Sequence, residues 1–91
     1  MTQTNIPITE EVKQRILAKS FIDAETGARK IQIGNSRLDF SWTYTIESFA
    51  KKTVKLSWIN GDTKEIEQGK VFEDEGEMRL MTRGWSYIEH I

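Results

Sequence analysis

The chain has 91 residues, of which 30% are charged and 37% hydrophobic, and its formal net charge is −1. This composition is too apolar for a disordered protein, and the length predicts one small domain, residues 1–91. The balanced charge argues against a duplex-DNA binder, and the absence of cysteine excludes disulfides and thiolate zinc sites.

The sequence carries no signal for export or membrane insertion. Its start lacks a basic segment followed by an apolar run, and no later stretch approaches the eighteen or so apolar residues of a membrane span. We therefore expect a cytoplasmic protein without a membrane segment.

A helix is predicted over residues 9–21, and the first six residues are predicted to be frayed. Thr9 can accept hydrogen bonds from the free amides of the first turn. Glu10 and Glu11 favour the positive end of the helix dipole. These signals place the start of the helix at Thr9.

The predicted helix is amphipathic. Val12, Ile16 and Leu17 form an apolar stripe at helical spacing, and the residues outside the stripe are polar. The stripe is expected to pack on a sheet. The sequence leaves open whether Phe21 and Ile22 end the helix or start a strand.

The sharpest pattern is the stretch RLDFSWTYTI, residues 37–46, which predicts a two-faced strand. Its apolar parity holds Leu38, Phe40, Trp42, Tyr44 and Ile46. A preceding strand over residues 29–33 carries Ile31 and Ile33 on one parity. A connecting loop of two residues would place Ile31 opposite Leu38, and a loop of four would place Ile33 there; both keep one dry face.

Residues 47–52 break the alternation and predict a helical turn or a wide corner. A strand over residues 53–59 follows, with Val54, Leu56 and Trp58 on one face. Asn60-Gly61 then signals a hairpin. We favour a three-residue loop, 60–62, which places Leu56 opposite Ile66 and Trp58 opposite Lys64, over a strict two-residue turn at Asn60-Gly61, which places Leu56 opposite Glu65.

The remaining chain predicts three more strands, over residues 63–72, 78–83 and 85–90, with an acidic turn at 74–77. The acidic side chains do not follow the spacing of a calcium loop, so a solvated turn is the better interpretation. The predicted fold is α+β: one N-terminal amphipathic helix packed on a twisted antiparallel β-meander of about five to seven strands.

The aromatic residues divide into two groups. Strict alternation predicts that Phe40, Trp42 and Trp58 belong to the core. Trp85 follows Arg83-Gly84 outside any alternating run, and arginine and tryptophan are enriched at protein interfaces. We therefore predict a partner-binding patch formed by Arg83, Trp85 and Tyr87.

The resulting hypothesis is a small non-enzymatic protein-interaction module. It would act as a self-dimer, an adaptor or an inhibitor of a partner protein, and small proteins of this composition are common among mobile-element and viral products. Long strands in a short chain leave sheet edges, and a homodimer is one way to cover them. A small-molecule carrier, with a pocket between helix and sheet, stays open as a further alternative.

The alternative function is binding of single-stranded nucleic acid. Lys51, Lys52 and Lys55 lie close to the aromatic strands, and charge beside aromatic rings is the combination that holds a single strand. Against this, acidic residues are interspersed with the lysines, as on an ordinary solvated face.

No residues are assigned to catalysis, to a cofactor or to a metal. The single histidine, His90, lies next to the last residue, and no serine has the surroundings of a nucleophile elbow. This inventory argues against nucleophilic catalysis and transition-metal chemistry.

Overall fold

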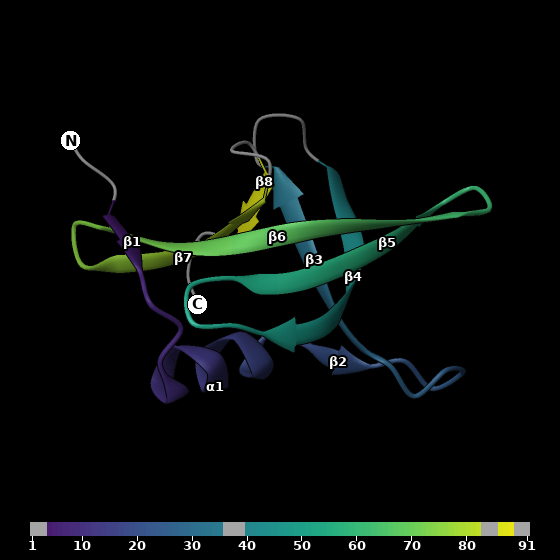
Figure 1. Cartoon of the computed structure of the whole chain (residues 1–91), viewed down its shortest axis with the longest axis horizontal. Coiled ribbons are helices and arrows are strands. Elements are labelled where there is room, and N and C mark those ends of the chain that lie inside the picture. Colours follow the sequence, from purple (N-terminus) through teal and green to yellow (C-terminus); the bar gives the residue numbers. More distant parts are fainter. Residues whose placement is uncertain (1–3, 36–39, 83–85, 89–91) are drawn as a thin grey trace.

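The computed structural model describes residues 4–35, 40–82 and 86–88. Over these residues the chain forms one short helix and a strongly curled antiparallel sheet, which confirms the helix-plus-sheet class (Figure 1). The elements are β1 (Thr4–Ile6), α1 (Glu10–Ala18), β2 (Phe21–Ile22), β3 (Arg29–Asn35), β4 (Phe40–Phe49), β5 (Val54–Asn60), β6 (Thr63–Asp74), β7 (Glu77–Thr82) and β8 (Ser86–Ile88).

Helix α1 starts where the sequence predicts and ends earlier. The Thr9 side chain accepts a hydrogen bond from the backbone N–H of Val12 at 3.2 Å. At the other end, the hydroxyl of Ser20 donates to the carbonyl of Leu17 at 2.6 Å and closes the last turn. The predicted end at residue 21 is therefore wrong, because the chain leaves the helix after Ala18 and enters β2.

The N-terminal segment is also ordered differently from the prediction. Residues 1–6 are predicted to be frayed, yet Thr4–Ile6 form β1, which pairs antiparallel with Val71–Glu73 of β6. The partner lies near the other end of the chain, so no local pattern reveals it. Residues 1–3 fall outside the described residues.

The predicted meander is present in β3 to β8, because each of these strands pairs with the next along the chain. The structure adds a closing contact, in which Gly34 of β3 opposes Tyr87 of β8. Strand β6 pairs with β5, β7 and β1. The sheet therefore curls around its own inner face.

The inner face of the curled sheet and one side of α1 enclose the core. The core side chains are Val12, Ile16, Ile31, Ile33, Tyr44, Val54, Leu56, Val71 and Leu80. Gly69 is also buried, and a Cβ at this position would lie 3.0 Å from Cδ1 of Leu80. The packing of the core therefore leaves no room for a side chain at position 69.

The β3–β4 hairpin has one apolar face, as predicted, but its register differs from both predicted registers. Ile33 opposes Trp42 and Ile31 opposes Tyr44, so isoleucines and rings share the inner face. The last pair is Asn35 with Phe40, whereas both predicted loops place Leu38 inside the pairing. The predicted strand start at residues 37–39 falls outside the described residues.

Strand β4 continues through residues 47–49, the first half of the predicted corner 47–52. Ile46 opposes Leu56 and Ser48 opposes Lys55, so Glu47 is the extra residue of a β-bulge. The chain turns only beyond Phe49, where Ala50 N–H donates to the Thr53 carbonyl at 2.8 Å. The break in alternation therefore begins with a bulge at Glu47, and the corner itself is confined to the residues after Phe49.

The β5–β6 hairpin corrects the predicted three-residue loop. Asn60 opposes Thr63, which leaves a two-residue turn at Gly61-Asp62 with a φ of +64° at Gly61. As a result Leu56 opposes Glu67, and Ser57 opposes Ile66. Both the preferred pairing and the alternative at Asn60-Gly61 are wrong.

The bounds of β6, β7 and β8 lie within two residues of the predicted bounds wherever the structure describes them. Residues 83–85 and 89–91 fall outside the described residues. No helix in the described part of the chain is long and apolar enough to span a membrane.

Candidate binding surfaces

The predicted partner-binding patch falls mostly outside the described residues. Arg83 and Trp85 lie there, and so does the side chain of Tyr87. The backbone of Tyr87 belongs to β8 and opposes Met81 of β7 as well as Gly34 of β3. The patch therefore stays a prediction.

The rings predicted to be core lie on the inner face where they are described. Tyr44 is only 2% exposed. Trp42 and Trp58 are partly buried and pack against the core cluster. The Phe40 side chain is outside the described part. Alternation thus identified the face of these tryptophans correctly.

A polar network crosses the outer face of the sheet between β4, β5 and β6. The hydroxyl of Ser57 donates a hydrogen bond of 2.6 Å to Oε2 of Glu47. The same oxygen lies 3.2 Å from Nζ of Lys64. The bulge places the Glu47 carboxylate over this surface. The Ser57 hydrogen bond, and then Lys64, hold the pKa of Glu47 below its ordinary value.

Two exposed isoleucines lie on the same hairpin. Ile59 of β5 is 69% exposed and Ile66 of β6 is 49% exposed. Their cross-strand partners are Lys64 and Ser57, so the isoleucines are diagonal neighbours on one face. We call Ile59 and Ile66 the hairpin patch. Figure 1 shows this hairpin projecting beyond the neighbouring strands.

Sequence reasoning missed the hairpin patch because of the register. The predicted three-residue loop places Ile66 opposite Leu56 and thus inside the domain, whereas the observed turn places it opposite Ser57. Ile59 carried a usable signal, since it falls on the opposite parity from Leu56 and Trp58 in the same strand.

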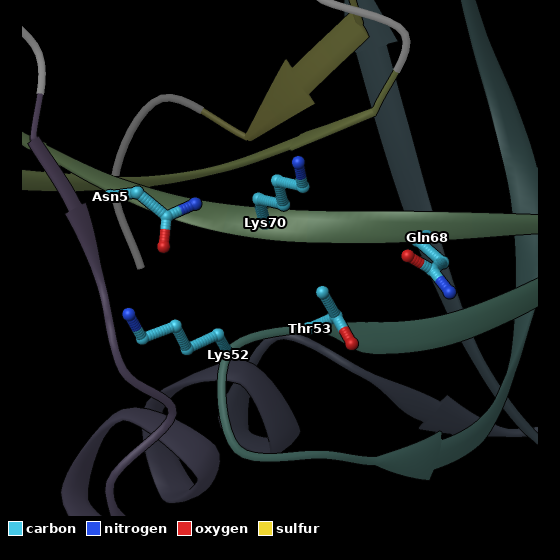
Figure 2. A pocket seen from close by; sticks show the side chains of 5 residues that line it. All are labelled: Asn5, Lys52, Thr53, Gln68 and Lys70. Carbon is cyan, nitrogen blue, oxygen red and sulfur yellow. The ribbon is translucent and has the colours of Figure 1, made fainter.

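A solvent-open hollow of about 510 Å³ forms the second surface. The described residues that line it are all of polar type and come from β1, from the turn before β5 and from β6; they are Asn5, Lys52, Thr53, Gln68 and Lys70. Figure 2 shows Asn5 and Lys52 extending into the gap between β1 and the start of β5. We call these five residues the polar hollow.

The three lysines of the nucleic-acid alternative are placed differently from one another. Lys52 lines the polar hollow. Lys55 opposes Gln68, one of its lining residues, and Lys51 precedes Lys52 in the corner between β4 and β5. The sequence did not single out Lys70, which joins Lys52 at the hollow only through the fold.

Among the described residues, no three histidine, aspartate or glutamate side chains form a group that could hold a metal ion. No known protein family matches the chain, and no curated protein or solved structure shows significant similarity to it.

Proposed function

We propose that the chain acts by protein association rather than catalysis, and that its partner is a second copy of itself bound through the hairpin patch. The observation that supports this most directly is the 69% exposure of Ile59 on a projecting hairpin. Large apolar side chains gathered on an exposed face are a common feature of association surfaces.

The charges around the hairpin patch favour a second copy as the occupant. Lys64 and Glu47 lie beside the isoleucines, so the surface carries both signs of charge. A twofold interface brings the same surface together from both subunits, and a surface of mixed sign can complement itself. The net charge of −1 adds little repulsion between copies.

The apolar part of the patch is small, which bounds the affinity. Two isoleucines are fewer than the side chains of a large obligate interface, so we expect a dissociation constant on the order of micromolar. The monomer and the dimer should therefore exchange as the protein concentration changes.

Sedimentation equilibrium over a range of concentrations tests this proposal. The unmodified protein should show a rising average mass, and Ile59→Lys or Ile66→Lys should remain a monomer because two buried lysines would face each other. Ile22→Lys is the matched control, since Ile22 is 52% exposed but lies on β2. A monomer at every concentration, or equal loss in the control, would contradict the proposal.

A further inference from the structure

The polar hollow has a structural origin in the way two strands share β6. Strand β5 ends its pairing with β6 at Val54 opposite Gly69, and β1 begins its own at Ile6 opposite Val71. Lys70 falls between these two pairings. Below the gap, the N–H of Ile8 donates to the carbonyl of Lys51 at 2.7 Å. Backbone hydrogen bonds therefore fix the position of the chain on both sides of the gap, in β1 and at the start of β5.

The side chains around the gap are rich in hydrogen-bond donors. Lys52 and Lys70 each offer a charged ammonium, Asn5 and Gln68 offer amide N–H groups, and Thr53 offers a hydroxyl. None of the lining residues that the structure describes carries a carboxylate. The lining residues therefore supply two ammonium groups and three neutral donors. In Figure 2 the Lys52 side chain extends toward β1, and the Lys70 side chain extends over β6 toward β7.

The two lysines of the hollow differ from Lys30 and Lys64, two lysines of the sheet that form ion pairs. Lys30 is bound to Asp23 at 2.8 Å and Lys64 to Glu47 at 3.2 Å. Within the described residues, no ion pair joins Lys52 or Lys70 to a carboxylate. Lys55, opposite Gln68, adds a further positive charge nearby. An anion in the hollow would reduce the repulsion among these groups.

We propose that the polar hollow binds a phosphate group, with Lys52 and Lys70 supplying the charge and Asn5, Thr53 and Gln68 supplying hydrogen bonds. A phosphate offers several strong acceptor oxygens, and lysine binds it as a point charge. The phosphate can come from the free anion or from the backbone of a single strand of nucleic acid, since both present the same chemistry. This site lies apart from the hairpin patch and does not depend on self-association.

A titration with inorganic phosphate, followed by amide resonances in two-dimensional NMR, tests the proposal. Phosphate at low ionic strength should shift the resonances of the five lining residues, and chloride at the same ionic strength should not. Lys52→Gln and Lys70→Gln should each weaken binding roughly fivefold, as expected for loss of one exposed charge contact. Lys19→Gln is the charge-matched control, because Lys19 is an exposed residue at the end of α1.

A second arm identifies the source of the phosphate. If a 12-nucleotide oligothymidine binds at lower concentration than inorganic phosphate and competes with it, the ligand is a nucleic-acid backbone. If inorganic phosphate alone binds, the ligand is the free anion; either result supports the site. Chloride shifting the same resonances, or phosphate binding unchanged in both hollow variants, would overturn it.

Discussion

The hydroxyl of Ser57 donates a 2.6 Å hydrogen bond to the carboxylate of Glu47, the residue that bulges out of β4. Ser57 itself is only 3% exposed, although it occupies the outer parity of β5. The bulge therefore accounts for a buried polar residue on the solvent side of the sheet.

Removing this hydroxyl should change the titration of Glu47. Ser57→Ala deletes the largest cause that holds the pKa of Glu47 below its ordinary value, so that pKa should rise. Carboxyl resonances followed by NMR against pH measure it directly. Lys55→Gln is the comparison, since Lys55 acts on Glu47 only through its charge and should change the pKa less. Equal effects of the two variants would contradict this explanation.

Acid should weaken the turn between β2 and β3. Lys30, and then the N–H of Glu25, hold the pKa of Asp23 below its ordinary value of 3.8. A carboxyl group whose pKa is lower in the folded state stabilises the fold at a pH above its unfolded-state pKa. That stabilisation is lost as the pH falls through the folded-state pKa. Urea unfolding at pH 7 and below pH 3.8 should therefore show a smaller acid loss in Asp23→Asn. Lys30→Met should reduce that loss too, and combining the two should add little further.

Gly69→Ala should destabilise the domain. The added methyl would lie 3.0 Å from Cδ1 of Leu80 and 3.1 Å from Cδ1 of Leu56, inside the core. Overpacking of this kind costs about 1 to 3 kcal/mol of unfolding free energy. Thermal and urea unfolding measure the loss.

A double variant tests whether Leu80 is the cause. Leu80→Val shortens the side chain that the new methyl approaches most closely, so combining it with Gly69→Ala should cost less than the sum of the single changes. Strict additivity would show that the strain at position 69 has another origin.

Replacing Glu75 should stabilise the β6–β7 hairpin. Asp74 opposes Glu77, and the two turn residues have positive φ, 53° at Glu75 and 83° at Gly76. Asparagine adopts this conformation more readily than glutamate, and Asn-Gly is a preferred pair in such turns. Glu75→Asn should therefore raise the unfolding free energy by about 0.5 kcal/mol. A lower melting temperature would contradict the turn assignment.

Local patterns predicted the faces of the elements better than their connections. The cap at Thr9 and the alternation through Trp42, Tyr44 and Ile46 depend on neighbouring residues, and both are confirmed. The register of β5 with β6 depends on which two residues form the turn, and a shift there moved Ile66 from inside to outside.

The candidate sites were harder to predict from the sequence than the faces of the elements. The polar hollow brings Asn5 close to Lys70 through the pairing of β1 with β6, two strands far apart in the sequence. Lys52 was singled out for its charge, but nothing local shows that it shares a hollow with Lys70. The hairpin patch could be predicted only with the correct position of the β5–β6 turn. Both surfaces depend on tertiary relationships that periodicity does not encode.

The position of β1 constrains the order in which the chain can assemble. A ribosome makes residues 4–6 early, but their partners at residues 71–73 only after most of the chain has emerged. Closing so long a loop costs entropy that the local hairpins do not incur, so β1 should dock after β5 has paired with β6. Pulsed hydrogen exchange during refolding should accordingly protect Leu56 before Ile6, and the reverse order would exclude this sequence of events. Strand β1 is therefore synthesised before its partner β6 but pairs with it only after the β5–β6 hairpin has formed.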